Sequence, residues 1–487
     1  MMSQYNKDFV SIKKPRIDWS ISEIQKGKAM ENSQAELHGS TLALPTSSAS
    51  RTRKIAIATI VGTTIEWYDY FIYAAVAGLV FNQLFFKPAG PAFATLLVFA
   101  SVGISFIFRP FGAFIAGYFG DKFGRKTVLA ATLIMMGGTT TLIGLLPTYD
   151  SVGIIAPIIL ILLRILQGIS AGGEWGGAVL MAVEHAPTHK RGLFSSFPQL
   201  GVPLGLLLAS LVLVIMTGYV SPGEEFLAWG WRIPFICSIF LFALGYWIRR
   251  SVEESPIFEE LKQKGTTQKP IRELFAQYKK VIFSSALLIA GTTALGYMTA
   301  GGFIQSFTTN PNGLNLERPI ILTLISISAV IWTFFTWLSA VLSDKFGRKP
   351  VYIFGSLIQI ITALMLFPLI STGNYSYIMS GLALLSMGIG ITYGVQAVFY
   401  SELFPASIRF SGISITYAIG SIIGGAFAPL IAAALIGKVN GIYLVSAYLT
   451  VMSVIAFLAI CIFKDRTGIA LEPDAEETQK KSPFIWK

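Results

Sequence analysis

Five ionisable side chains lie inside long apolar runs of this 487-residue chain: Glu66, Asp69, Arg109, Arg164 and Glu174. Because an ionisable group inside a membrane costs a few kcal/mol unless it is paired, each of them marks a candidate functional site. The three carboxylates and two guanidinium groups leave one excess negative charge when all five are ionised. A bound proton would neutralise that charge, which predicts proton-linked chemistry.

The carboxylates are the candidates for holding the coupled proton. Glu66 and Asp69 are three residues apart and share one face of a helix. Since two nearby carboxylates in a low dielectric cannot both ionise cheaply, one of them is expected to carry the proton. Glu174 is a further candidate. In the alternative interpretation, Glu66 and Asp69 are fixed partners of the two arginines, and the proton binds elsewhere.

Depth along the helices predicts which charges meet. A rise of about 1.5 Å per residue places Glu66 and Asp69 roughly 18 to 22 Å into the first apolar run and Arg164 about 16 Å into the fourth. All three are therefore expected near the midplane, with Arg164 facing Glu66 or Asp69. The same reasoning places Arg109 and Glu174 at comparable depths, so we expect them to pair.

Arg164 is a candidate for binding substrate, because a guanidinium offers a rigid fork that holds a carboxylate through two hydrogen bonds. Gln167, one turn further on, would add a neutral donor. Alternatively, Arg164 relays charge to the proton site. Polar and aromatic groups inside apolar helices either line a cavity or bond a neighbouring helix. Those predicted to bind substrate with Arg164 and Gln167 are Arg109, Tyr73, Tyr393 and Gln396, and weaker candidates are Gln199, Tyr297, Gln305 and Tyr400.

The elements that position these residues are membrane-crossing helices. Hydrophobic residues make up 53% of the chain and charged residues only 13%, against roughly 25% charged in soluble domains. A soluble globule is therefore excluded, and at about 20 residues per crossing the apolar content supplies roughly a dozen helices. The apolar runs lie near residues 55–81, 92–119, 127–147, 152–185, 193–218 and 231–250, and near 281–309, 318–342, 351–370, 377–400, 412–436 and 441–463.

Basic residues gather in alternate loops, at 121–126, 189–191, 249–250 and 344–349. The positive-inside rule then places these loops and both termini in the cytoplasm. The expected organisation is a disordered cytoplasmic tail over 1–53, a six-helix bundle over 54–250, a cytoplasmic linker over 251–280, a second six-helix bundle over 281–465 and a cytoplasmic tail over 466–487.

Two motifs recur in the second half of the chain. GYFGDKFGRK at 117–126 returns as AVLSDKFGRK at 340–349, an offset of 223 positions, and the pair Glu184 and Arg191 returns as Glu402 and Arg409 at an offset of 218. Two independent motifs at nearly one offset indicate a duplication. Parallel six-helix repeats with substrate held between them are typical of one large class of transporters.

These motifs resemble those of the major facilitator superfamily, whose loop signature matches GYFGDKFGRK. Within it, IEWYDYFIY at 65–73, RILQGISAGGEWGGA at 164–178 and SELFPASIRFSG at 401–412 resemble the metabolite:H⁺ symporter family. The family includes carriers for shikimate, α-ketoglutarate, citrate, proline and betaine, and the segments GGEWGGA and SFPQLG look closest to the shikimate-type carriers and to uncharacterised metabolite carriers. The resemblance covers about residues 54–465 and implies an all-α membrane protein of twelve helices in two pseudo-symmetric halves.

The repeated loop also has a physical interpretation as a conformational gate. Asp121 and Asp344 can accept hydrogen bonds from the first amides of a facing helix, because those amides have no partner within their own helix. Contacts of this kind would form and break as the halves move. The gate is predicted to comprise Asp121, Arg125, Glu184, Arg191, Asp344, Arg348, Glu402 and Arg409, with Arg125 pairing Glu184 and Arg348 pairing Glu402.

Several other classes of function are disfavoured. The net charge of +11 is explained by cytoplasmic loops, so no nucleic acid partner is expected. Cys237 and Cys461 have no paired spacing, which gives no disulfide framework, metal site or cofactor site. The segment GISAG matches a serine-hydrolase motif, but the three histidines lie in the N-terminal tail or at a cytoplasmic loop, so Ser170 has no base within the bilayer and no enzyme activity is expected.

Together these features predict a proton-coupled symporter of the bacterial inner membrane that imports a small organic acid, with the bilayer, protons and a carboxylate-bearing solute as its partners. Proline or betaine uptake is the alternative within transport, although only about 22 residues without heptads follow the last helix. Drug efflux is a weaker alternative. A non-transporting sensor of the same fold is the alternative from another class.

Overall fold

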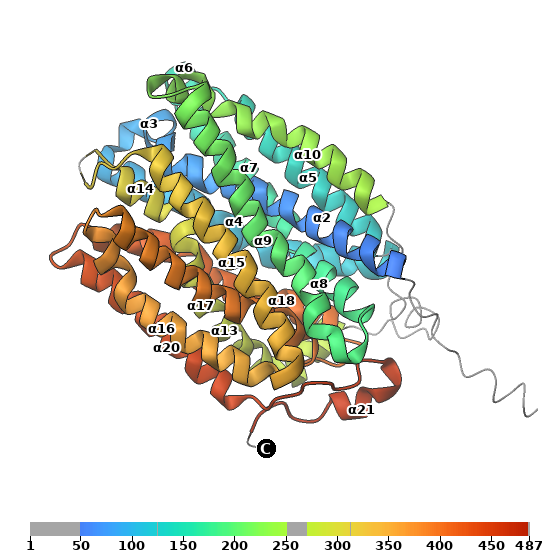
Figure 1. Ribbon diagram of the computed structural model, residues 1–487. Helices are drawn as coiled ribbons and strands as arrows, with labels where there is room; N and C mark the ends of the chain where they lie inside the picture. The colour runs from blue at the N-terminus through green and yellow to red at the C-terminus, as the bar shows by residue number, and fades with distance from the viewer. Residues whose placement is uncertain (1–48, 124, 251–269, 312, 486–487) are drawn as a thin grey trace, which may run out of the picture. The chain divides into compact units, whose positions relative to one another are not determined.

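Apolar stretches fold as helices in a membrane because no water is present to satisfy an exposed backbone. The computed structural model describes residues 49–123, 125–250, 270–311 and 313–485. Ten helices among these residues are long and apolar enough to cross a membrane, and Ala130–Leu145 is a shorter apolar stretch. With the first long helix, α2 (Ala49–Val76), they make the twelve helices in two halves that the sequence predicts (Figure 1).

The first half runs from α2 to α10. Its helices are α2 with its continuation η1 (Ala77–Phe81) and α3 (Asn82–Leu84), α4 (Pro91–Phe123), α5 (Arg125–Leu145), α7 (Ile155–Ala171) with α8 (Glu174–Glu184), α9 (Arg191–Ile215) with η4 (Met216–Val220), and η5 (Phe226–Gly230) with α10 (Arg232–Arg250). Short turns lie between them at η2 (Lys87–Ala89), α6 (Tyr149–Val152) and η3 (Thr188–Lys190).

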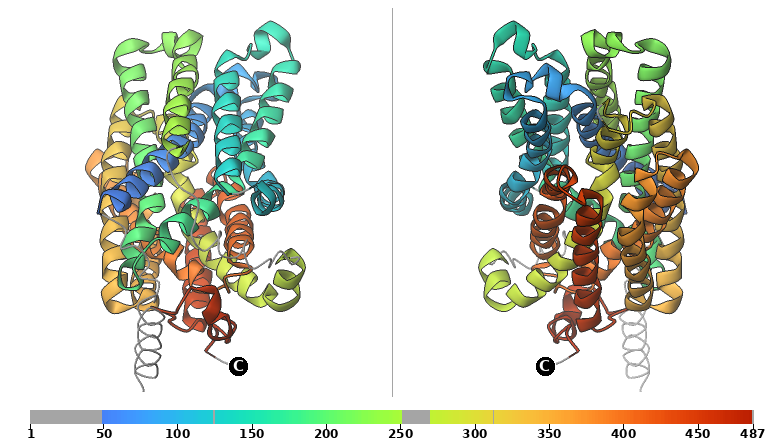
Figure 2. Two further views of the ribbon diagram at one scale, coloured as in Figure 1. Left: turned by 90° about the vertical axis from the view of Figure 1, so that its right-hand side faces the viewer. Right: turned by 90° about the vertical axis from the view of Figure 1, so that its left-hand side faces the viewer.

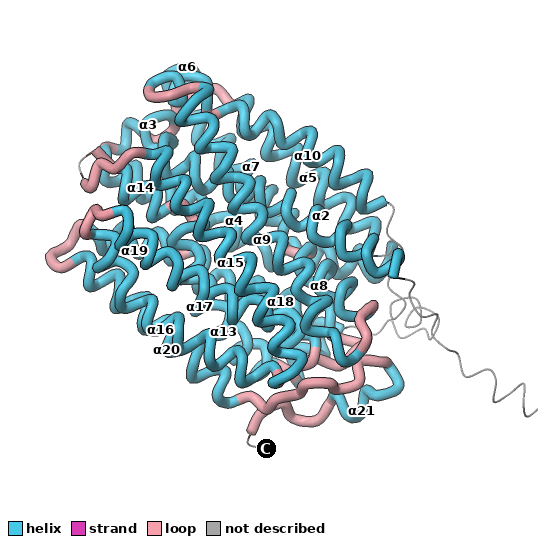
Figure 3. Tube along the Cα trace, in the orientation of Figure 1, coloured by secondary structure: helices cyan, strands magenta, loops and turns pink. Residues whose placement is uncertain are grey.

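The second half repeats this plan. Its helices are α13 (Lys279–Ala300) with α14 (Phe303–Thr309), α15 (Arg318–Phe346), α16 (Arg348–Ser371), α17 (Tyr375–Ser401), α18 (Arg409–Ser421) with η6 (Ile422–Ala426) and α19 (Ala428–Ile436), and α20 (Gly441–Ile462). The short α12 (Pro270–Gln277) precedes α13, and η7 (Pro473–Ala475) and α21 (Glu476–Gln479) follow α20. Apart from one isolated β-bridge, the regular structure described is helical (Figure 3).

Several helix contacts join the halves, the most extensive being those of α9 with α15 and α17 and of α4 with α18, η6 and α19. Within each half, small residues lie where helices approach closely. A Cβ on Gly168 would strike the backbone of Ser105, and one on Gly172 would strike the backbone of Arg109, so α7 and α4 approach backbone to backbone. Gly424 meets Ala290 of α13 in the same way. Close approach of this kind is what small residues permit in membrane helices.

Two of the long helices are broken, which the apolar pattern did not reveal. The fourth crossing is interrupted at Gly172–Gly173, between α7 and α8, and the seventh is interrupted at Gly301–Gly302, between α13 and α14. Gly302 has a φ of 80°, and a Cβ there would collide with the carbonyl of Ala74 in α2. Glycine is therefore required at this break for its backbone angle and for the contact with the first half.

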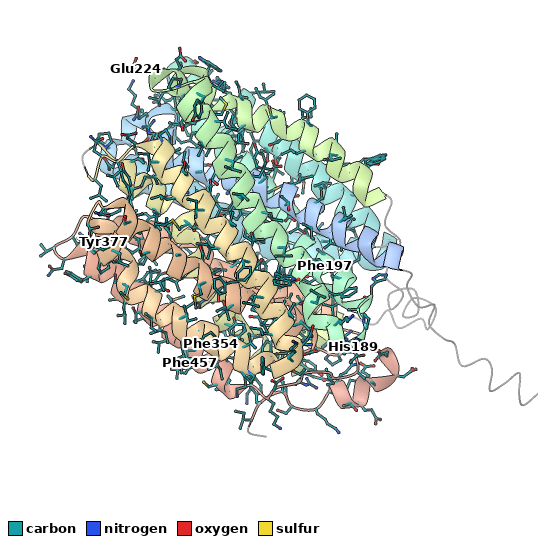
Figure 4. The ribbon with its side chains drawn as sticks, in the orientation of Figure 1. His189, Phe197, Glu224, Phe354, Tyr377 and Phe457 are labelled. Carbon is teal, nitrogen blue, oxygen red and sulfur yellow. The ribbon has the colours of Figure 1, made fainter. Side chains whose placement is uncertain are left out.

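The bundle has two distinguishable ends. We call the end that carries the repeated loops at 121–126 and 344–349 the motif end. His189 lies near it, while Glu224 and Tyr377 lie near the opposite end (Figure 4). Residues 464–485 fold back over the motif end, where α21 is placed (Figure 2). We call residues 464–485 the C-terminal strap. The predicted tail over 1–53 and linker over 251–280 lie largely outside the described residues.

Candidate transport site

A small cavity of about 30 Å³ lies between the two halves. Rings dominate its wall, and residues of α2 and α9 meet residues of α13, α15, α17 and α18 there. Transport sites for small molecules need roughly 300 Å³ or more, so the halves must separate before a solute can fit. The lining residues are Trp67, Phe71, Val202, Thr292, Thr293, Gly296, Tyr297, Ala300, Trp332, Ile389, Tyr393 and Tyr417.

Arg109 lies beside this cavity, within a cluster of aromatic rings. Its guanidinium carbon is 4.2 Å from the ring centroid of Phe106, 5.4 Å from that of Trp67 and 5.7 Å from that of Tyr70. Its side chain also contacts Tyr297 in the cavity wall, and Nε is buried without a hydrogen-bond partner. A cation over ring faces in a dry site is held by the ring quadrupoles and keeps its hydrogen-bonding capacity for an incoming anion.

Glu66 and Asp69 have different surroundings despite their spacing. Glu66 is close enough to Arg109 and Tyr417 to interact with both electrostatically, which places it on the cavity side. Asp69 instead faces the hydroxyls of Thr140 and Ser238, within the first half, and its Oδ1 is buried without a hydrogen-bond partner. The spacing predicts one shared site for the two carboxylates, whereas the structure gives them different neighbours.

Arg164 is fully buried and bonded to protein groups. Nη1 donates to Gln167 Oε1 at 2.6 Å, Nη2 donates to Ser105 Oγ at 2.9 Å, and the guanidinium carbon lies 3.8 Å from the ring centroid of Tyr73. Gln167 Nε2 donates in turn to Thr140 Oγ1 at 2.7 Å. The chain of contacts Arg164, Gln167, Thr140 and Asp69 therefore links α7 and α5 to the buried carboxylate on α2.

Both expected charge pairs are therefore wrong in this conformation. Arg164 faces α4 carbonyls, a serine and an amide rather than Glu66 or Asp69. Among the described residues, the ion pairs do not include Arg109 with Glu174, because Arg109 points into the aromatic cluster while Glu174 is buried in the first turn of α8. Depth estimates fixed the heights of these residues but not the direction in which each side chain leaves its helix.

Several site residues were missed by sequence reasoning. Trp175 stacks on Tyr417 with centroids 4.0 Å apart, so the first half touches the second through two rings. Trp175 Nε1 donates to Gln199 Oε1, and Gln199 Nε2 donates to the carbonyl of Tyr393, both at 2.8 Å. Trp67 and Trp175 each follow a buried glutamate in the sequence, which is the signal that could have indicated them.

The remaining predicted cavity groups divide into two sets. Tyr393 lines the cavity, as does Tyr297. Tyr73 bonds Ser101 Oγ at 2.7 Å inside the first half, and Gln396 donates to the Tyr400 hydroxyl at 3.3 Å inside the second. Tyr73 and Gln396 therefore bond neighbouring groups in this conformation, and a role for them in substrate binding stays a prediction.

The motif end is closed by contacts between the halves. Asp344, at the end of α15, accepts hydrogen bonds from the amides of Gly192 at 2.8 Å and Leu193 at 2.9 Å, in the first turn of α9. The predicted contact of Asp344 with helix amides is thereby confirmed. Arg348 supports it by donating to Asp344 Oδ1 at 2.7 Å. Gly347, between them, has a φ of 92°, which explains the glycine in the repeated loop.

The other residues of the predicted gate extend this contact. Arg348 lies 3.4 Å from Glu402, as predicted, and Arg409 lies 3.9 Å from Glu184 of the other half. Arg191 instead bonds the C-terminal strap, through the carbonyl of Ile469 and the carboxylate of Glu472 at 3.6 Å. The side chains of Asp121 and Arg125, and hence the expected pair of Arg125 with Glu184, lie outside the described residues.

The sequence predicts a cytoplasmic tail over 466–487, whereas the structure bonds the strap to residues of the predicted gate. Gln479 Oε1 accepts from the amide of Ala406 at 2.8 Å and from Arg409 Nη2 at 3.2 Å. Asp465 and Thr467 accept from the first amides of α16, at Lys349 and Arg348. Its side chains thus satisfy backbone groups around the repeated loop of the second half, and Arg191 ties it to the first half.

Comparison with known proteins decides the family. Residues 59–429 match the Major Facilitator Superfamily. The chain belongs to this superfamily. Its similarity to metabolite transporters of the superfamily confirms the resemblance seen in the sequence, and members of this kind are multi-pass membrane transporters.

Relatives in this superfamily align over most of the chain. It is 38% identical to the inner membrane metabolite transport protein YhjE of Escherichia coli K12, over 84% of this chain and 93% of that protein. It is also 38% identical to the shikimate transporter of the same strain, over 86% and 96%. The glycine betaine/proline/ectoine/pipecolic acid transporter OusA of Dickeya dadantii is 33% identical, over 87% and 85%.

Among solved superfamily structures, the proton:xylose symporter XylE bound to 6-bromo-6-deoxy-D-glucose superposes with a TM-score of 0.72. The alignment covers 88% of this chain and 99% of that one at 20% identity. At that identity the likeness establishes the fold of two six-helix halves.

Proposed function

We propose that the chain is a proton-coupled symporter that imports a small organic acid across a bacterial inner membrane by alternating access. The observation that carries the proposal is the separation of two buried ionisable sites. Arg109 lies beside the cavity between the halves, whereas Asp69 lies inside the first half. One site can therefore bind an anionic solute while the other binds and releases a proton.

A mechanism follows from the contacts of Asp69. Protonation at this carboxylate changes the charge at one end of the chain Asp69, Thr140, Gln167 and Arg164. Arg164 in turn holds the carbonyls of Ser101 and Val102 in α4, the helix that meets α18 of the second half. A proton at Asp69 is thus positioned to shift the interface that opens and closes the cavity.

The substrate is expected to bear a carboxylate that approaches Arg109. A guanidinium in a water-excluded site binds carboxylates strongly, and the surrounding rings suit a compact apolar or cyclic body. The relationship to a shikimate transporter supports an organic acid. The positive-inside rule supports an orientation in which the motif end and both termini face the cytoplasm.

Osmolyte uptake is a second candidate, favoured by the rings of the cavity wall. Trp67, Trp332, Tyr393 and Tyr417 supply aromatic rings to the wall, and such rings can hold quaternary ammonium groups. The similarity to OusA supports this alternative. A zwitterion would place its carboxylate at Arg109 and its cation among the rings.

The first experiment measures lumenal pH in proteoliposomes while shikimate, α-ketoglutarate, citrate, benzoate, proline and betaine are added in turn. A response to one or more of the acids would support the proposal, and a response to proline or betaine alone would favour osmolyte uptake. If folded protein gives no pH response to any of these solutes and catalyses no counterflow exchange, the result would contradict transport and favour a sensor.

Asp69→Asn then tests the proton site. We expect uphill accumulation driven by a pH gradient to be lost, while exchange of labelled for unlabelled substrate continues, because exchange requires no net proton movement. Asp150→Asn makes the same chemical change at an exposed loop residue and should leave both activities intact. Uphill uptake that survives Asp69→Asn would show that this carboxylate does not carry the proton.

A further inference from the structure

A large pocket opens on the outer surface of the second half, at the motif end. Its volume is about 700 Å³, within the roughly 300 to 1,000 Å³ of small-molecule sites. It is separate from the transport cavity, which shares no lining residue with it. The wall is formed by α12, α13, α18, α20 and the strap, through Phe275, Lys279, Lys280, Ile282, Phe283, Ser284, Ile419, Ile462, Ser482 and Phe484.

The interior of the pocket is apolar and lies beside a membrane-crossing helix. Phe283 on α13 is 60% exposed and Phe275 on α12 is 43% exposed, and α13 is one of the membrane-crossing helices. Ile419 and Ile462 form the wall from α18 and α20. Large apolar groups exposed on a crossing helix contact acyl chains, so a hydrocarbon chain is the natural occupant of a recess among them.

The rim of the pocket is cationic. Lys279 and Lys280 are the first two residues of the crossing helix α13, which places their ammonium groups where the hydrocarbon region ends. Both side chains are exposed, and among the described residues neither has an acidic partner. A pair of cations above an apolar recess matches an amphiphile with an anionic head.

We propose that this pocket binds an anionic phospholipid of the bilayer, with one acyl chain among Phe283, Ile419 and Phe484 and its phosphate at Lys279 and Lys280. The strap contributes Ser482 and Phe484 to the wall, so the lipid also contacts the segment that covers the gate. Recognition of the lipid by the pocket depends on the net negative charge of the lipid as well as on its hydrocarbon chain. A zwitterionic phospholipid with the same chains lacks the net negative charge.

The test titrates phosphatidylglycerol and phosphatidylcholine of identical acyl chains onto the purified full-length protein and counts bound lipids by native mass spectrometry. We expect tighter binding of phosphatidylglycerol to the wild type. Lys279→Gln with Lys280→Gln should weaken phosphatidylglycerol binding about thirty-fold, because each lysine near an anionic lipid contributes about 1 kcal/mol and the double substitution removes two. Ile419→Trp fills the recess, keeps both lysines and should also remove the bound lipid.

Lys190→Gln with Lys345→Gln is the matched control, since it removes two exposed lysines at the same end but outside the pocket. Equal binding of the two lipids by the wild type would overturn the proposal, and so would equal losses in the control and the pocket variant. An unchanged melting temperature in the variants shows that loss of lipid is not loss of fold.

Discussion

Arg109 combines a buried guanidinium with a free Nε beside the cavity, so it is the residue whose loss should most affect substrate binding. Arg109→Lys keeps the positive charge and removes the planar guanidinium that can form two hydrogen bonds with one carboxylate. Since a hydrogen bond to a charged group contributes about 1.5 to 3 kcal/mol, we expect substrate binding to weaken by roughly 10-fold to 100-fold. Isothermal titration with the solute that drives proton uptake measures this change.

Arg318→Lys serves as the control, because Arg318 begins α15 away from the cavity. Arg164→Lys is an informative comparison. Arg164 bonds four protein groups, so its replacement should lower the melting temperature as well as transport. Unchanged affinity in Arg109→Lys would remove this arginine from the substrate site.

Glu402 supplies a pH dependence at the motif end. Burial raises the pKa of its carboxyl above the ordinary value of 4.5, and Arg348 opposes that rise. A carboxyl with a raised pKa holds its proton in the folded state at pH values where the unfolded chain has released it. Its contribution to stability is therefore complete below pH 4.5 and falls as the pH rises through the folded-state pKa.

Glu402→Gln should accordingly reduce the loss of stability as the pH rises above 4.5. Melting temperatures measured across that range in detergent test this expectation. Glu477→Gln, at an exposed position of the strap, is the matched control and should follow the wild-type profile. Parallel profiles for Glu402→Gln and the wild type would contradict the assigned direction.

At the scale of elements, the break between α13 and α14 contacts α2 of the first half, and we expect this contact to matter for closure at the end opposite the motif loops. Gly302→Ala places a Cβ against the carbonyl of Ala74 and strains a residue with a φ of 80°. A non-glycine residue in that region costs about 1 to 2 kcal/mol before any clash. We expect transport to slow at least tenfold, because the halves can no longer close tightly at α2.

Gly437→Ala is the control for Gly302→Ala, since a Cβ at Gly437 meets open space. It should leave uptake rates unchanged. Uptake and substrate affinity are measured together, because a defect in closure lowers the rate more than the affinity. Normal uptake by Gly302→Ala would show that this contact is not needed for the transport cycle.

The sequence predicts which segments cross the membrane but not where those helices break. Apolar composition and repeat spacing identified the twelve helices, the duplication and the contact of Asp344 with helix amides. The break at Gly172–Gly173 was not predicted, because apolar residues continue on both sides of it. The directions in which the side chains of Glu66, Asp69 and Arg164 point were not predicted either, since they depend on how neighbouring helices are rotated against one another.

At the scale of the whole molecule, the C-terminal strap connects both halves. Ending the chain after Lys464 would remove the partners of Arg191 and Arg409 at Ile469, Leu471 and Gln479. We expect the motif end to open more often and the melting temperature to fall by several degrees. Distances between spin labels at His189 and at Ser407, both outside the deleted segment, would report the opening.

Glu472→Gln separates the strap as a whole from a single ion pair. Glu472 is 56% exposed, so its pair with Arg191 contributes at most about 1 kcal/mol. The substitution should therefore have much less effect than the truncation. An unaltered distance distribution after truncation would show that the strap does not hold the gate closed.

The order of synthesis gives the strap a further consequence. Arg191 precedes its strap partner Ile469 by 278 residues. At about 5 to 20 residues added per second, the ribosome takes on the order of tens of seconds to reach that partner. During this interval the arginine must be solvated by water or lipid headgroups. The contacts that close the motif end through the strap are thus completed late in biogenesis, after the last crossing helix, α20, has been synthesised.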